Sequence, residues 1–325
     1  MTKYVVSGYI GFDNFGDEAI AGVLVEYLKS IGAEKITLIS ANPSKTSKIY
    51  GVESCKMLDF FKSILESDVL ISGGGSLLQD ITSLKSLLYY LVIIMSAIAF
   101  NKKVIIFAQG FTPFRTKIGK FLTKFVLKKC DIISVRDLKS AEILNKMGIK
   151  STLCADPVFG INIPKTQKKE GIGIQLRNFP TLTDNFLECL ADNIAQKFPD
   201  KCVKLISLQD SLDLVVIQKF SQMLKMRNIE FEIIKNLNVK DAIFELSNLE
   251  YLIGMRFHAC LVAAKAGVKV IGINYDIKVH NLAIQVGFPI IGLLECDINT
   301  EINKLFELNP NNYQIPTFNF DNIIQ

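Results

Sequence analysis

The chain has 325 residues, of which 49% are hydrophobic and 21% charged, and this composition excludes an intrinsically disordered protein. Its length exceeds what one hydrophobic core usually organises, so we expect two domains. The net charge is only +5 at pH 7, and the lysines are scattered along the sequence. This pattern argues against a nucleic-acid partner and favours anionic small molecules or an anionic membrane surface.

The first half of the chain alternates short apolar runs with amphipathic stretches, a pattern typical of βα units in a parallel sheet. The first helix is predicted over Glu18–Ile31, with Asp17 as its N-cap and Gly32 at its C-terminal end. Strands are predicted at Tyr4–Ile10, Lys35–Ser40, Asp68–Ser72, Val104–Ala108, Ile132–Val135 and Thr152–Cys154.

The most apolar segment of this half is Leu87–Phe100. It is shorter than the roughly 20 residues that span a bilayer, so we predict a buried helix. Because Lys102 and Lys103 follow it, a peripheral contact with the inner face of the membrane is the alternative. The N-terminal residues do not form a signal peptide, and we expect a cytoplasmic protein.

The segment Asp156–Gly171 holds two prolines and a lysine-rich run, and we interpret it as a linker. After it the alternating pattern begins again, with strands predicted in "GIGIQLR" and at Val203–Ser207, Phe231–Ile234, Tyr251–Ile253 and Val268–Ile273. We therefore predict two doubly wound Rossmann-like α/β domains, over residues 1–160 and 171–308, with an irregular tail over 309–325. Such a GT-B-like fold has an interdomain cleft, and its ligands bind outside the carboxyl ends of the strands.

Two glycine-bearing loops of the first domain are candidates for ligand binding. In "GYIGFDNFGDEA", Asn14 and Asp17 accompany a strand-to-helix turn that could hold a polar or anionic group, although a plain tight turn explains the glycines equally well. In "LISGGGSLLQD" and the later "AQG", bare backbone lies beside polar side chains, although helix–sheet packing is the alternative. The candidates from the second pair are Gly73, Gly74, Gly75, Gln79, Asp80 and Gln109.

Two arginines each follow a predicted strand, Arg136 in the first domain and Arg177 in the second. A guanidinium at that edge of a sheet points to the region where ligands bind, and its geometry suits a carboxylate or phosphate. A salt bridge to a neighbouring carboxylate is the alternative for each. Asp137, next to Arg136, is predicted to cap the following helix.

The stretch "GMRFHACLVAAKAG" carries the strongest candidates for chemistry. Arg256 and His258 flank a strand-to-helix turn, where a charge, a helix dipole and a group that titrates near neutral pH come together. A histidine that only fills the core is the alternative. Lys278, in "INYDIKVHN" after the next strand, is predicted to add a second cation, while His280 is assigned to the surface or to capping.

These motifs occur together in one order: "GYIGFDNFGDEAI", "SGGGSLLQD", "AQGFTP", "SVRD", "ADPVF", "GMRFHA" and "YDIKV". The ordered set, from about Ser7 to about Asn281, resembles the polysaccharide pyruvyl transferases, and most closely their cell-wall polysaccharide branch. The resemblance implies transfer of pyruvate from phosphoenolpyruvate to a sugar of a cell-surface polysaccharide, or of its lipid-linked precursor, as a cyclic ketal. It implies that Arg256, Arg136 and Lys278 hold the donor and that His258 is the acid.

The sequence departs from the family where "AQGFTP" replaces the usual "GQGIGP", and this departure, at Phe111 and Thr112, concerns the acceptor. A GT-B glycosyltransferase with a nucleotide-sugar donor is the alternative function, and a non-enzymatic saccharide-binding protein is a third. We expect no cofactor beyond phosphoenolpyruvate as donor substrate. The seven cysteines form no C-x-x-C pair and there are two histidines, so we also expect reduced thiols and no metal site. The sequence does not indicate the oligomeric state.

Overall fold

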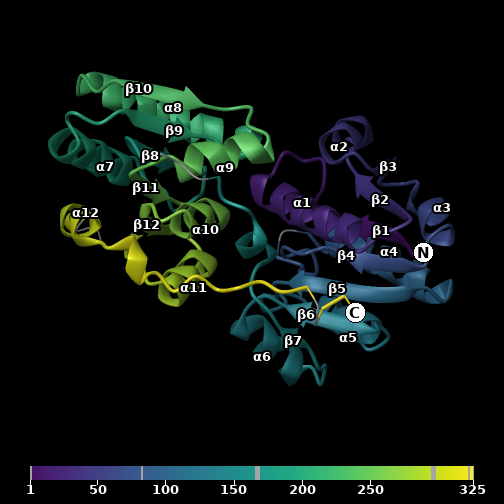
Figure 1. Ribbon diagram of the computed structural model, residues 1–325. Helices are drawn as coiled ribbons and strands as arrows, with labels where there is room; N and C mark the ends of the chain where they lie inside the picture. The colour runs from purple at the N-terminus through teal and green to yellow at the C-terminus, as the bar shows by residue number, and fades with distance from the viewer. Residues whose placement is uncertain (1, 82, 165–168, 294–297, 321–322, 325) are drawn as a thin grey trace. The chain divides into compact units, whose positions relative to one another are not determined.

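The computed structural model in Figure 1 describes residues 2–81, 83–164, 169–293, 298–320 and 323–324. The chain divides into two compact units. The first comprises Met1–Ile161 together with Thr317–Gln325, and the second comprises Asn162–Pro316. The predicted tail, residues 309–325, is therefore divided between the units: its residues up to Pro316 belong to the second unit and those from Thr317 to the first. Part of the predicted linker, residues 165–168, lies outside the described residues.

The first unit is built on a seven-stranded parallel sheet in the order β3-β2-β1-β4-β5-β6-β7. Its strands are β1 Lys3–Ser7, β2 Lys35–Ser40, β3 Glu53–Lys56, β4 Val69–Ser72, β5 Lys103–Gln109, β6 Ile132–Val135 and β7 Thr152–Leu153. Its helices are α1 Phe15–Ser30, α2 Pro43–Tyr50, α3 Phe60–Leu65, α4 Leu84–Ala99, α5 Lys117–Leu127, α6 Leu138–Lys146 and the short η1 Pro157–Gly160. The strand order reverses between β1 and β4, which is where ligands of doubly wound folds bind.

Two hydrophobic layers cover the faces of this sheet. On one face, helices α3 to α6 pack their apolar side chains against alternate strand residues such as Ile106. The next residue, Phe107, points to the opposite face, since side chains alternate along a strand. There the returning C-terminus packs: the Phe320 ring stacks on Phe107 and on Tyr27 of α1, with centroid distances of 5.8 and 3.9 Å.

The second unit repeats the architecture with a six-stranded parallel sheet in the order β10-β9-β8-β11-β12-β13. Its strands are β8 Ile172–Gln175, β9 Val203–Ile206, β10 Phe231–Ile234, β11 Tyr251–Gly254, β12 Lys269–Asn274 and β13 Ile290–Gly292. Its helices are α7 Asp184–Lys197, α8 Asp210–Met226, α9 Val239–Ser247, α10 Phe257–Lys265, α11 Ile277–Val286, α12 Ile298–Glu307 and the short η2 Pro310–Asn312. The predicted fold of two doubly wound α/β units is confirmed.

Several local predictions can be compared with these bounds. Strands β2, β6 and β10 have the predicted limits, whereas β3 and β13 were not predicted, because "ESCK" and "IIG" are short and β3 is largely polar. The prediction of Asp17 as N-cap of the first helix is wrong. Helix α1 begins at Phe15, and the side chain of Asn14 accepts a hydrogen bond from Gly16 N at 3.1 Å.

Two other predictions concern helix ends and thiols. Asp137 caps α6 as predicted, accepting a hydrogen bond from Ser140 N at 2.8 Å. The cysteines within the described residues are free thiols, and Cys296 lies outside those residues.

The apolar segment Leu87–Phe100 forms most of α4 and the residue after it. Its buried side chains join the core of the first unit, as predicted for a buried helix, and Leu88, Val92 and Phe100 are exposed. Among the helices of the described ranges, none combines the length and the hydropathy that crossing a bilayer requires.

Candidate functional site

Four predicted site residues of the second unit lie at one edge of its sheet. Arg177 follows β8, Arg256 and His258 follow β11, and Lys278 follows β12. These three strands are neighbours and run parallel, so their carboxyl ends meet on the same side. The fold therefore brings together residues that are up to about one hundred positions apart in the sequence.

Arg256 is held by a buried carboxylate. Its Nε and Nη2 atoms donate to the two oxygens of Asp213, at 2.9 Å to Oδ2 and 2.6 Å to Oδ1. Nη2 also donates to Gln209 Oε1 at 3.2 Å. Asp213 is 0% exposed and Arg256 is 8% exposed. Because two parallel hydrogen bonds fix a planar guanidinium, the orientation of Arg256 is set by the protein, and Nη1 takes no part in these contacts.

The carboxylate of Asp213 is itself positioned by its surroundings. It lies in the first turn of α8 and accepts hydrogen bonds from Leu208 N at 3.0 Å and Gln209 N at 3.1 Å. Gln175, at the end of β8, donates to Asp213 Oδ2 at 3.3 Å and accepts from Arg256 N at 2.7 Å. A negative charge near a helix N-terminus is favoured by the helix dipole.

Sequence reasoning missed Gln175, Gln209 and Asp213. A usable signal was present for the two glutamines, which stand at or just after the end of an apolar strand run, in "GIGIQ" and "LISLQ". Asp213 lies farther along the chain, in the first turn of α8. Their burial could not be inferred, because a polar residue there is equally compatible with an exposed loop.

His258 and Lys278 occupy the first turns of two neighbouring helices. His258 is the second residue of α10, half-buried, and its ring meets that of Phe257 edge-on with centroids 4.9 Å apart. Lys278 is the second residue of α11 and is also half-buried; its backbone N–H donates to the N-cap Asp276 at 2.9 Å. The first turns of helices carry N–H groups without intrahelical partners, so both residues lie where an anion is favoured.

Arg177 lies beside Tyr275. Its Nη1 donates to the tyrosine hydroxyl at 3.5 Å, a long contact, and its Nε is buried without a hydrogen-bond partner in the described part of the chain. Burial raises the pKa of Tyr275, and the nearby Arg177 opposes that rise. A buried guanidinium nitrogen that lacks an acceptor is costly, and an anionic ligand would supply one.

In the first unit, the three glycines after β4 are shaped by packing. Gly75 has a φ of +96°, and a Cβ there would lie 2.7 Å from Asp17 Oδ1. A Cβ on Gly74 would lie 3.1 Å from Ile20 Cγ2, and the Gly73 N–H donates to Ser7 O at 2.6 Å. The glycines thus allow α1 to approach β4 closely, which is the packing alternative named for them above.

Gln109 and Gly110 connect β5 to this loop. Gln109 Nε2 donates to Gly75 O at 3.0 Å, and Gly110 N donates to the same oxygen at 2.7 Å. Gln109 Oε1 is buried and has no hydrogen-bond partner among the described residues. The fold therefore brings Asp17, Gly75 and Gln109 together at the carboxyl edge of the sheet.

The remaining loop candidates, Gln79 and Asp80, accept hydrogen bonds from backbone N–H groups. Asp80 accepts hydrogen bonds from Arg115 N at 2.7 Å, Thr116 N at 2.8 Å and Thr116 Oγ1 at 2.5 Å. Burial alone would raise the pKa of Asp80, but these hydrogen bonds outweigh it and lower that pKa. Gln79 Oε1 accepts from Ile81 N at 2.7 Å. These contacts brace the loop between β4 and α4 and the start of α5.

Arg136 forms the salt bridge that was its alternative assignment. Its Nη1 lies 2.6 Å from Asp156 Oδ2, and both side chains are almost fully buried. Nη2 donates to Ser76 Oγ at 3.4 Å, which places the guanidinium beside the glycine loop. A Cβ on Gly110 would lie 2.8 Å from Ser76 Oγ and 2.9 Å from Arg136 Nε, so a larger residue there would displace these side chains.

The residues that depart from the family motif have different positions. Phe111 is 3% exposed and packs in the core, and its N–H donates to Ser140 Oγ at 2.7 Å. Thr112 follows it, with a buried hydroxyl that has no partner among the described residues. The Phe111 side chain therefore supports the loop by packing in the core and does not form a surface that a ligand could touch.

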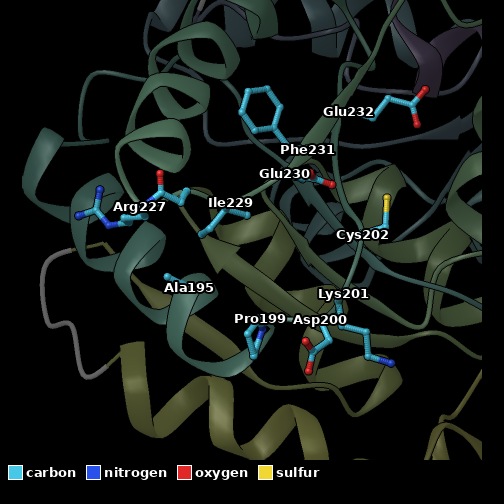
Figure 2. A pocket seen from close by; sticks show the side chains of 11 residues that line it. Ala195, Pro199, Asp200, Lys201, Cys202, Arg227, Ile229, Glu230, Phe231 and Glu232 are labelled. Carbon is cyan, nitrogen blue, oxygen red and sulfur yellow. The ribbon is translucent and has the colours of Figure 1, made fainter.

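Two pockets within the described residues lie away from these side chains. One of about 690 Å³ is lined by Lys201, Cys202, Glu230 and their neighbours, which precede β9 and β10 (Figure 2). Another, of about 630 Å³, lies beside Lys35 and Glu53 at the start of β2 and β3. Both are at the amino ends of parallel strands, the edge opposite to that where ligands of such sheets bind.

Solved structures with a similar fold include three sugar-nucleotide proteins. A putative UDP-N-acetylglucosamine 2-epimerase from Listeria monocytogenes has a TM-score of 0.66 at 12% identity, over 99% of this chain and 94% of that one. UDP-GlcNAc 2-epimerase from Methanocaldococcus jannaschii has 0.65 at 12% identity, over 98% and 96%. Anabaena HepE with UDP and glucose has 0.63 at 10% identity, over 97% and 92%. At such low identity they show the fold alone, which is the predicted GT-B-like fold.

No curated protein matches the sequence. A family model does: residues 14–277, which include every candidate site residue described above except Lys278, match the model described as polysaccharide pyruvyl transferase. Since that match covers most of the chain, the protein belongs to the polysaccharide pyruvyl transferase family.

Proposed function

We propose that the protein transfers pyruvate from phosphoenolpyruvate to a sugar of a cell-surface polysaccharide, or of its lipid-linked precursor, and forms a pyruvate ketal. The observation that carries the proposal is the convergence of Arg177, Arg256, His258 and Lys278 at the ends of three adjacent strands. In a member of this family, that set offers cations and helix N-termini to one ligand. Phosphoenolpyruvate carries both a carboxylate and a phosphate and needs several such groups.

Arg256 is the principal donor-binding group in this proposal. Asp213 holds its guanidinium through Nε and Nη2, which leaves Nη1 to face the ligand. Because the side chain is already ordered, little conformational entropy is lost on binding. Arg177 and Lys278 supply further positive charge, and the Nε of Arg177 has no acceptor within the ranges that the structure describes.

The proposed reaction balances with one titratable group. A proton goes to the methylene carbon of phosphoenolpyruvate, which becomes the methyl group, and the first sugar hydroxyl adds to the neighbouring carbon. The second hydroxyl then displaces phosphate. The two hydroxyls lose two protons, of which one replaces the proton given to carbon and the other leaves with phosphate. His258 gives the first proton and is restored by a hydroxyl, a role worth about 10²–10⁴ in rate.

The acceptor belongs to the first unit in this proposal. Asp17, Gly75 and Gln109 meet at the carboxyl edge of its sheet, and Gln109 Oε1 has no acceptor role among the described residues. Arg136, with its charge balanced by Asp156, is assigned here to holding the glycine loop, and its contact with the donor stays a prediction.

A ligand panel tests the proposal against its alternatives. Phosphoenolpyruvate should raise the melting temperature, since a ligand at one hundred times its Kd stabilises the folded state by about 2.7 kcal/mol. Stabilisation by UDP or a UDP-sugar instead would indicate a glycosyltransferase; the similar Anabaena protein was crystallised with UDP and glucose. If neither phosphoenolpyruvate nor a UDP ligand changes the melting temperature, both enzymatic functions are contradicted. A saccharide-binding protein is then the remaining alternative.

Arg256→Ala provides the second measurement. If Nη1 contacts the donor, calorimetry should show phosphoenolpyruvate binding weakened by about 2–5 kcal/mol. Arg227→Ala is the matched control, because Arg227 also pairs with two carboxylates, Glu188 and Asp192, at the surface of the same unit. Equal binding by the wild type and by Arg256→Ala would remove Arg256 from the donor site.

A further inference from the structure

Helix α5 carries an exposed apolar row of three side chains. Ile118, Phe121 and Phe125 are 57%, 66% and 49% exposed. Their spacing places them on one side of the helix, since residues three and four apart are neighbours on a helix surface. The core-facing side of α5 is formed by Gly119, Thr123 and Val126, so the exposed row is not needed for packing.

A row of lysines runs beside the apolar row. Lys117, Lys120 and Lys124 each directly precede one of the three apolar residues, and Lys128 continues the same spacing. Lys129 lies over the Phe125 ring, with its Nζ 5.0 Å from the centroid. None of these lysines is in an ion pair among the described residues. An apolar row flanked by lysines is the pattern of helices that lie in a membrane interface.

The surrounding sequence strengthens the positive charge. From Ile81 to Cys130 there is no aspartate or glutamate, while nine of the chain's 37 lysines and arginines lie there. The rest of the chain therefore has 28 basic residues against all 32 acidic ones. The expectation that the lysines are scattered along the chain is therefore wrong, because they are enriched in this segment. The flanking Asp80 and Asp131 are engaged with backbone N–H groups of Thr116 and Val104.

Helix α4 extends this surface. It packs beside α5 on the same face of the sheet and exposes Lys85, Leu88 and Val92, again at helical spacing. The other α4 side chains of Leu87–Phe100 are mostly in the core, so the membrane contact first expected from that segment is better carried by α5.

We propose that α5, with the exposed side of α4, docks the first unit on an anionic lipid surface. The apolar row enters the boundary between headgroups and acyl chains, and the lysine row binds lipid phosphates. We assign anionic lipid as the occupant because the charged residues of α4 and α5 are all lysines. Strand β5 ends at Gln109, and the segment that follows it leads into α5, so docking would bring a lipid-linked acceptor toward the acceptor edge of the first unit. That consequence rests on the proposed function, whereas the docking does not.

Vesicle sedimentation of the full chain tests this surface. The wild type should bind vesicles containing phosphatidylglycerol, release them as salt rises, and bind phosphatidylcholine alone weakly. Ile118→Ser/Phe121→Ser/Phe125→Ser should lose most binding. Changing Lys117, Lys120, Lys124 and Lys128 to Gln should weaken binding to anionic vesicles by roughly fivefold per lysine at low salt.

Matched controls come from exposed side chains of the second unit. Val215→Ser/Phe244→Ser and Lys225→Gln/Lys235→Gln/Lys240→Gln should bind as the wild type does. Unchanged melting temperatures would show that the α5 variants fold. The proposal is overturned if the wild type ignores anionic vesicles, if the α5 variants bind like the controls, or if light scattering shows a dimer that the α5 variants abolish. Phosphoenolpyruvate binding, measured without vesicles, reports separately on the proposed function.

Discussion

Arg256 and Asp213 form a buried bidentate pair, with Nη2 to Oδ1 at 2.6 Å and Nε to Oδ2 at 2.9 Å. The pair joins two strand ends, because Arg256 follows β11 and Asp213 lies in the helix after β9. Gln175, between them at the end of β8, bonds to both partners. The orientation of the arginine thus depends on groups that no ligand touches.

Asp213→Asn should therefore act on the donor through Arg256. Removing one partner of a buried ion pair costs about 3–5 kcal/mol, because the remaining charge is left uncompensated. We expect a lower melting temperature and, by calorimetry, weaker binding of phosphoenolpyruvate. Asp192→Asn is the control: Asp192 pairs with Arg227 at 2.7 Å but is largely exposed, so its loss should cost about 0–1 kcal/mol.

A second variant guards against an unfolded Asp213→Asn protein. Gln209→Ala removes the 3.2 Å hydrogen bond to Nη2 and leaves the ion pair in place. It should raise the Michaelis constant for phosphoenolpyruvate more than it lowers the melting temperature. Normal donor affinity in both variants would show that the pair only stabilises the fold.

The strand ends of the second unit were predictable because one physical rule connects them. Arg177, Arg256 and Lys278 each follow an apolar run, and parallel strands bring their carboxyl ends to one edge. Asp213 was not predictable, since its role depends on the ion pair with Arg256. The two residues follow different strands, β9 and β11, and lie far apart in the sequence. Arg136 shows the same limit: its position was foreseen, but the buried partner Asp156, twenty residues later, could be identified only from the structure.

Gly75→Ala tests whether the glycine loop is required for packing. Both a φ of +96° and a Cβ 2.7 Å from Asp17 Oδ1 oppose the substitution. Gly32→Ala is the matched control, because Gly32 also has a positive φ, +73°. Its added Cβ would meet nothing within 4 Å among the described residues beyond its own neighbours along the chain. The control should lose about 1–2 kcal/mol from backbone strain alone.

Gly75→Ala should lose clearly more stability in urea denaturation than this control. Because the nearest atom belongs to Asp17, the double variant Asp17→Ala/Gly75→Ala should recover part of the difference. Equal losses at the two glycines would mean that the loop yields easily and that close packing does not account for Gly75.

Glu18 should make stability fall as pH rises. Burial raises its pKa above the ordinary 4.5, against hydrogen bonds from Tyr50 and Gly11. A carboxyl with a raised pKa in the folded state favours folding while it is protonated, and this contribution is lost as pH rises from 4.5 through the folded pKa. Glu18→Gln keeps the shape and cannot ionise. Its free energy of unfolding should be nearly equal to that of the wild type near pH 4 and higher at pH 8; identical pH profiles would contradict a raised pKa.

His258→Gln separates a proton donor from a residue that only packs. Glutamine has a similar reach and can hydrogen-bond, but it does not titrate near pH 7, so a catalytic role predicts loss of kcat with donor affinity nearly retained. Turnover is followed as phosphate release from phosphoenolpyruvate, with a lipid-linked saccharide extract of the source cells as acceptor. His280→Gln is the control, because His280 is the other histidine of the chain and is also half-buried in the first turns of a helix, α11. If His258 only fills space beside Phe257, the substitution should instead lower the melting temperature and leave turnover per folded molecule near that of the wild type. A stable His258→Gln protein with full turnover would end the catalytic assignment.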